Sequence, residues 1–137
     1  MATVSPAVAR RFSPEDVIVG LLALTENAAG GVRFLADTVR IHKGVATLRK
    51  DSRFSDLFGG LAFDARDYFP YCDSLEGILD GLQLSGYLER TNPRGTHYLS
   101  LPSLRAMFDS NIRQKFTDDE LASLREASAK FFAMLRP

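Results

Sequence analysis

Residues 72–101 read CDSLEGILDGLQLSGYLERTNPRGTHYLSL. Four apolar side chains recur at the spacing of one helix face: Leu75, Ile78, Leu79 and Leu82. We therefore predict a helix over residues 73–85, closed by Gly86. Residues 92–95, Asn-Pro-Arg-Gly, suit a type I turn and should join two strands. The stretch is thus expected to form a helix followed directly by a tight hairpin.

The expected turn also sets the pairing of the two strands. Leu88 pairs with Leu99 in this register, and this apolar pair should face the core. Arg90 pairs with His97, and both should gather with the tip residue Arg94 at the outer end. The hairpin is therefore expected to be basic at its tip.

The helix itself carries the opposite charge. No Lys or Arg occurs from Tyr71 to Glu89, whereas four residues of this stretch are acidic: Asp73, Glu76, Asp80 and Glu89. If the helix read bases in DNA, only Gln83 would offer a common base-contacting side chain. The alternative is a solvated acidic face or a surface for a basic protein partner at residues 73–85. Because phosphate charge dominates DNA affinity, the acidic composition favours this alternative.

The composition places the chain among ordinary globular proteins. It has 137 residues, of which 45% are hydrophobic and 25% charged, and this predicts a single domain with its own core. Lys plus Arg and Asp plus Glu both number 17, so the net charge is zero. Any contact with DNA must then come from local clusters of basic residues. The helices and the hairpin together predict a mostly helical α+β fold.

The N-terminal half is expected to contain further helices. Residues 1–12 are predicted to be a loose arm, and residues 13–137 a single domain. A helix should begin at the N-cap Ser13 and end at Gly30-Gly31, because its first turn holds Pro14 and two acids. A second helix is expected from Val32 to near Gly44, with a short one through Leu48. Residues 51–60 should form a loop pinned by Phe54 and Phe58, and residues 61–68 a short strand.

The C-terminal part predicts two more helices, one opening at Pro102 and one at residues 118–135. Thr117 and Glu120 form a capping-box pattern at the start of the last helix. Five of its apolar residues are candidates for a homodimer interface: Leu121, Leu124, Phe131, Phe132 and Leu135. Packing of the same side chains within the domain is the alternative.

Basic residues cluster between residues 33 and 53. Arg40 and Lys43 from this stretch join Arg90, Arg94 and His97 as candidate contacts to the DNA backbone. However, Asp37 is four residues after Arg33 and three before Arg40, so these charges can pair on a helix surface. A solvated charged face is therefore the alternative.

No pattern in the sequence predicts catalysis. Cys72 begins a helix, where the dipole can favour a thiolate, but neither His42 nor His97 is near it in sequence. We expect an inert, partly buried thiol. The histidines and carboxylates lack metal-ligand spacing, and no glycine-rich phosphate loop or nucleophile elbow occurs. The prediction is a protein that is not an enzyme and has no cofactor and no metal site.

The longest apolar stretch, residues 17–24, is far shorter than a membrane span. The first residues also lack the long apolar core of a secretory signal. We therefore expect a cytoplasmic protein with no membrane partner.

The order of helices, a helix ending Ser-Gly-Tyr-Leu-Glu-Arg, a hairpin and closing helices resembles the winged-helix superfamily over about residues 13–101. A looser resemblance is to the SocA-like (Panacea) antitoxin domains and small bacterial relatives, which carry a Tyr-Gly-Pro-Tyr-like element before the same helix. Here that element is Tyr68, Phe69, Pro70 and Tyr71, with Phe in place of Gly. The resemblance implies binding to DNA or to a protein.

The functional expectation is a DNA-binding transcriptional regulator, or an accessory of one, that contacts duplex DNA through its basic wing. The alternative is a protein-interaction module, antitoxin-like, that does not bind DNA. Local basicity of the wing favours the first, and the acidic helix with zero net charge favours the second.

Overall fold

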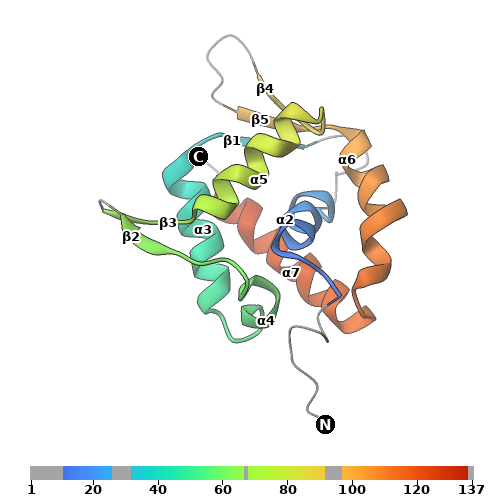
Figure 1. The fold of residues 1–137 in the computed structure, drawn as a ribbon, viewed down its shortest axis with the longest axis horizontal. Coiled ribbons are helices and arrows are strands. Elements are labelled where there is room, and N and C mark those ends of the chain that lie inside the picture. Colours follow the sequence, from blue (N-terminus) through green and yellow to red (C-terminus); the bar gives the residue numbers. More distant parts are fainter. Residues whose placement is uncertain (1–10, 26–31, 67, 92–96, 136–137) are drawn as a thin grey trace.

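The computed structural model describes residues 11–25, 32–66, 68–91 and 97–135. Its helices and strands, in chain order, are α2 (Pro14–Ala23), β1 (Val32–Leu35), α3 (Thr38–Lys50), α4 (Ser55–Phe58), β2 (Asp64–Arg66), β3 (Phe69–Tyr71), α5 (Asp73–Leu84), β4 (Leu88–Arg90), β5 (His97–Ser100), α6 (Pro102–Met107), the π-helix η2 (Phe108–Ile112), the 3-10 helix η3 (Arg113–Lys115) and α7 (Asp118–Met134). The helices pack together, and a small antiparallel sheet, β1-β5-β4, lies at one edge of them, which confirms the α+β class (Figure 1).

Helix α2 forms the centre of the helical layer. Its residues from Asp16 to Ala23 are all buried, and it contacts α4, α5, α6 and α7. The predicted N-cap is confirmed, since the Ser13 hydroxyl accepts from the Asp16 amide and the Asp16 carboxylate accepts from the Ser13 amide. The prediction of its end is wrong, because α2 ends at Ala23 rather than at the glycines. Arg105 from α6 donates to the Ala23 carbonyl at 3.2 Å and so caps this end.

The segment after the glycines is a strand and not a helix, so the prediction of a helix from Val32 is wrong. Strand β1 pairs antiparallel with β5, and Ser100 Oγ lies 3.1 Å from the Val32 nitrogen. The two residues are 68 positions apart, so the periodicity of the residues around Val32 could not predict this pairing. Arg33 therefore lies on a strand, where the expected helical pairing with Asp37 does not apply.

Helix α3 begins at Thr38 and runs without a break to Lys50. The expected stop near Gly44 is wrong, and the helix packs against Phe131 of α7 at this position. A Cβ added to Gly44 would lie 3.3 Å from Cδ1 of Phe131. The glycine therefore serves helix packing and does not end the helix.

A second, separate hairpin follows α3. Phe54 and Phe58 are fully buried and anchor the connection, as predicted, but the short helix α4, which ends at Phe58, replaces part of the expected loop. Strand β2 confirms the predicted short strand, and it pairs with β3, whose residues Phe69 to Tyr71 were not expected to be a strand. This hairpin extends beside α3, at a different edge of the molecule from β4 and β5 (Figure 1).

Helix α5 and the strands β4 and β5 follow the predicted order. The helix over residues 73–84 is confirmed. Gly86 has a φ of 82°, in the left-handed region, and turns the chain from α5 into β4. The Tyr87 amide donates to the Leu82 carbonyl at 2.9 Å and closes the helix end.

The predicted register of β4 and β5 is wrong by one residue. Leu88 pairs with Ser100 and Arg90 with Tyr98. Strand β5 also pairs with β1, and Phe34 of β1 contacts Tyr98 with ring centroids 5.4 Å apart. Burial of Tyr98 against this neighbour decides which face of β5 lies inside, and a shift of one residue exchanges the two faces.

Candidate functional site

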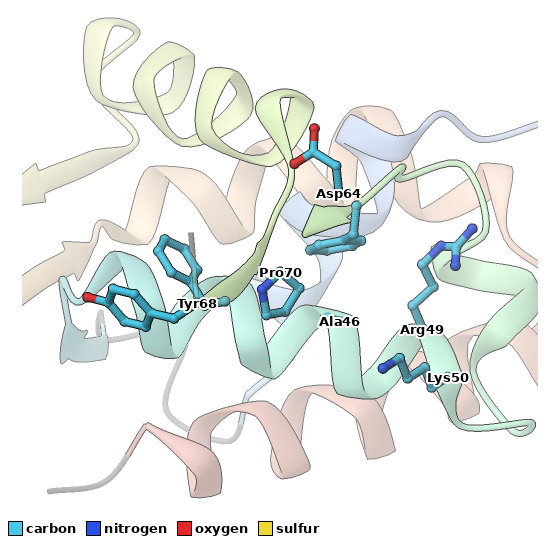
Figure 2. A pocket seen from close by; sticks show the side chains of 8 residues that line it. Ala46, Arg49, Lys50, Asp64, Tyr68 and Pro70 are labelled. Atoms are coloured by element: carbon cyan, nitrogen blue, oxygen red, sulfur yellow. The ribbon is translucent and has the colours of Figure 1, made fainter. Parts of the chain in front are cut away.

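An open groove lies between α3 and the β2–β3 hairpin, with a volume of about 500 Å³. Helix α3 contributes one wall, and the hairpin with the residues before it contributes the other (Figure 2). The groove is lined by Ala46, Arg49, Lys50, Phe63, Asp64, Tyr68, Phe69 and Pro70. Aromatic and apolar side chains therefore face a helix edge that carries two cations.

His42 is the residue that attaches this hairpin to α3. Its imidazole is fully buried and stacks on the Tyr71 ring, with centroids 4.5 Å apart and an interplanar angle of 9°. Phe69 meets the same imidazole edge-on at 6.3 Å and also contacts Tyr71. The aromatic side of the groove is thus held in place by a residue of α3.

Both ring nitrogens of His42 have defined partners. Nδ1 accepts a hydrogen bond from the backbone amide of Cys72 at 3.0 Å. The ring proton must then reside on Nε2, which donates to Oε1 of Glu76 at 3.0 Å. The imidazole therefore joins α3 to the first turn of α5 as a neutral donor and acceptor.

This geometry also explains the state of Cys72. Sequence reasoning placed no histidine near it, but the fold brings His42 to its backbone. Because Nδ1 already accepts the Cys72 amide, this nitrogen is not available to take the thiol proton. The thiol is buried, and its Sγ accepts from the Leu75 amide at 3.4 Å, as an N-cap of α5. The side chain thus has a capping role at the start of the helix.

The two cations of the groove are not neutralised by neighbours. Within the described part of the chain, Arg49 and Lys50 form no ion pair. The nearby carboxylate of Asp51 is taken by Arg53 at 3.0 Å and by Lys130 at 3.6 Å. Asp64 lines the groove, but its carboxylate points away from both cations (Figure 2). The end of the groove at Arg49 and Lys50 is therefore electropositive.

The exposed side of α3 is basic along its whole length. Its exposed residues are Arg40, Lys43, Thr47, Arg49 and Lys50. Arg40, Lys43, Thr47 and Lys50 follow one another at intervals of three, four and three residues and form one line, here called the basic stripe. Arg40 pairs with Asp37 at 3.8 Å, which confirms that pairing, and Asp37 caps the helix. Arg40 and Lys43, expected to act together, are thus brought to one surface.

The exposed side of α5 is different. Its exposed residues are Asp73, Ser74, Gly77, Asp80 and Leu84, and Leu84 is 89% exposed. Glu76 points to His42, and the Gln83 amide lies 3.5 Å from the Tyr98 hydroxyl. The surface is acidic, as the sequence indicated, and α3 and α5 present opposite charges.

Arg90 and His97, which were expected to lie together at the hairpin tip, lie on opposite faces of the sheet. Arg90 lies over the Tyr98 ring, 5.1 Å from its centroid, and its Nη2 donates to the Tyr98 hydroxyl at 3.3 Å. His97 is adjacent to Tyr98 in β5 and so faces the other side of the sheet. The expected cluster of Arg90 with His97 is therefore wrong, for the same reason as the register. Arg94 lies outside the described residues.

The predicted interface residues of α7 pack against their own chain. Leu121, Leu124, Phe131 and Leu135 are at most 8% exposed, and Phe132 is half-buried with its ring 5.4 Å from that of Phe34. Ser128 also donates to the Leu21 carbonyl at 2.7 Å, which ties α7 to α2. These side chains form the domain core, and a homodimer stays a prediction.

Two residues of the expected N-terminal arm make contacts. Phe12 stacks on Phe116, with centroids 4.7 Å apart, and Arg11 lies 3.7 Å from Glu120. The rest of that arm lies outside the described residues.

Among the described residues there is no cluster of three or more metal-ligating side chains. None of the described helices combines the length and the apolar character needed to span a membrane.

The sequence did not predict the groove, although its lining includes Tyr68, Phe69 and Pro70 of the Tyr-Phe-Pro-Tyr element. The sequence pattern did not predict β3 because Pro70 lies within it, and proline is rare within sheets.

Comparison of the chain with known protein families, with curated proteins and with solved structures finds no match.

Proposed function

We propose that this protein is a non-enzymatic DNA-binding module of winged-helix type, acting as a transcriptional regulator or an accessory of one. The observation that carries this proposal is the basic stripe of α3. Three of its four residues are cations. Helix α5 is bound to α3 through His42, which is buried and lies outside the stripe, so α5 does not cover these cations. The helix, the left-handed Gly86 and the two wing strands that follow it support the winged-helix assignment.

The stripe has suitable dimensions for the phosphate backbone. Arg40 and Lys50 are ten residues apart, which corresponds to about 15 Å along the helix axis. About three phosphate contacts would give a slope of about 2.7 in the dependence of log affinity on log salt concentration. Binding should thus be weak, insensitive to sequence and strongest at low salt. In this proposal the main contact to DNA lies on α3, and not at the wing tip as the sequence predicted.

The test measures binding to a labelled 20-base-pair duplex over a salt series. Replacement of Arg40 and Lys43 by alanine should lower the slope by about 1.8, that is about 0.9 for each lost phosphate contact. Arg125→Ala removes an exposed cation of α7 outside the stripe and should leave the slope unchanged. If the parent protein binds no duplex at low salt, the proposal is overturned. Loss of the slope only in Arg90→Ala would instead assign the contact to the wing.

A further inference from the structure

The groove beside α3 shares Lys50 with the basic stripe, but its aromatic side chains and Arg49 lie outside the stripe. Its aromatic wall lies on the hairpin, and Tyr68 at the rim is 80% exposed. Ala46 and Pro70 lie between Tyr68 and the two cations Arg49 and Lys50 (Figure 2). A ligand along this groove therefore meets an aromatic end, an apolar middle and an electropositive end.

We propose that this groove binds a short acidic segment of a partner protein. An aromatic or aliphatic side chain of the segment packs on Tyr68 and Pro70, and its carboxylates pair with Arg49 and Lys50. Tyrosine and arginine are the side chains that most often carry binding energy at protein interfaces. Arg49 can receive a carboxylate in a bidentate arrangement, because its guanidinium has no acidic partner among the described residues.

Charge complementarity selects an acidic occupant over a basic one. Cations at the last turn of α3 also complement the helix dipole, but this effect does not explain the exposed Tyr68 across the groove from them. Asp51 does not neutralise them, because its carboxylate is engaged by Arg53 and Lys130.

The openness of the groove selects a peptide over a small molecule. Small ligands are held in cavities that bury most of their surface. An open groove leaves one side of its occupant in water, which a polypeptide segment tolerates. The stacking of His42 on Tyr71 attaches the hairpin to α3, and a wall that is in place before binding lowers the entropic cost.

The experiment selects binders from a phage-displayed library of random eight-residue peptides. The parent protein should enrich peptides with two or more carboxylates close to an aromatic or aliphatic residue. Arg49→Glu should shift the selection to peptides with basic residues beside the same apolar ones. Arg125→Glu makes the same charge change on α7 and should keep the acidic preference. Selection of no peptide, or of the same peptides by Arg49→Glu, would overturn the proposal.

A synthetic copy of the most enriched peptide then locates the site. Tyr68→Ser should weaken its binding about tenfold with the melting temperature unchanged, because the ring is exposed. Amide signals of residues 46–50 and 68–71 should shift on titration. Shifts confined to residues 73–84 would place the peptide on α5 and overturn the proposal. Arg40→Ala with Lys43→Ala should leave peptide affinity unchanged, which separates this site from duplex binding.

Discussion

The Nδ1 atom of His42 accepts the backbone amide hydrogen of Cys72 at 3.0 Å, across 30 positions of sequence. This bond and the one from Nε2 to Glu76 join α3, the end of the β2–β3 hairpin and α5. The groove and the start of α5 thus depend on one buried imidazole.

Replacement of this imidazole should be costly. We expect His42→Ala to lower the free energy of unfolding by about 2–4 kcal/mol, because it leaves a cavity and a buried amide without its partner. Urea unfolding followed by circular dichroism measures this loss. His97→Ala changes the other histidine, which is half-buried, and should cost about 1 kcal/mol or less. Equal losses in the two variants would contradict the linking role of His42.

Cys72 should tolerate serine better than alanine. Its Sγ caps α5, and a serine hydroxyl can accept the same Leu75 amide, whereas alanine cannot. We expect Cys72→Ala to be less stable than Cys72→Ser by about 1 kcal/mol. Because the thiol is 1% exposed, iodoacetamide at neutral pH should alkylate it only slowly in the folded protein and rapidly in urea. Rapid alkylation of the folded protein would contradict the capping role.

Gly20 is required by the close approach of α2 and α7. A Cβ at this position would lie 2.5 Å from Cδ2 of Leu124 and 3.0 Å from Cε1 of Phe108, both of which are buried. We expect Gly20→Ala to destabilise the protein by about 1–3 kcal/mol through overpacking.

Gly77 provides the matched control for this substitution. It lies on the exposed side of α5, and a Cβ there would meet nothing within 4 Å. Gly77→Ala should stabilise the protein by up to about 1 kcal/mol, since alanine favours a helix over glycine. Chemical denaturation gives the change in the free energy of unfolding for each variant, which should fall for Gly20→Ala and rise for Gly77→Ala. Stabilisation by both substitutions would show that the helices can separate at Gly20 at little cost.

Acid should weaken the connection between the end of α3 and α7. Side-chain and backbone hydrogen bonds from Arg53 hold the pKa of Asp51 well below its ordinary value. A depressed pKa in the folded state stabilises the protein above the unfolded pKa of about 3.9, and this contribution is lost as the pH falls toward the folded pKa.

Comparison of the parent with Asp51→Asn tests this expectation. The stability difference between them should be constant from pH 7 to 5 and shrink progressively between pH 4 and 2. Because the carboxylate and its partners are partly exposed, 1 M NaCl should also reduce the difference. A difference independent of pH would mean that the network does not contribute through the charge of Asp51.

Burial raises the pKa of Asp109, but hydrogen bonds from Arg113 and the charge of Arg105 outweigh this effect and lower it overall. Asp109 pairs with Arg105 of α6 and with Arg113 of η3. This carboxylate should therefore lose its stabilising contribution over the same acidic range. It adds to the acid sensitivity of the parent and does not affect the comparison with Asp51→Asn.

Local signals in the sequence were sufficient for several elements. The N-caps at Ser13 and Thr117 were confirmed, because capping depends on residues three positions apart. Helix α5 and its closing glycine were confirmed, because the apolar spacing and the glycine are also local signals. The burial of Phe54 and Phe58 was confirmed as well. The acidic surface of α5 also follows from composition alone, since the stretch contains no cation.

Tertiary structure decided the remaining features, because they depend on partners that are distant in the chain. Strand β1 is a strand since β5 binds it, and Tyr98 buried beside Phe34 sets the register that separates Arg90 from His97. The groove exists because His42 binds the backbone at Cys72 and holds the hairpin against α3. The sequence by itself determined where α2 and α7 begin and where α5 lies, because caps and helix faces depend on residues close in the chain. Long-range pairing, which local periodicity does not encode, decided which side chains meet and made residues 32–35 a strand.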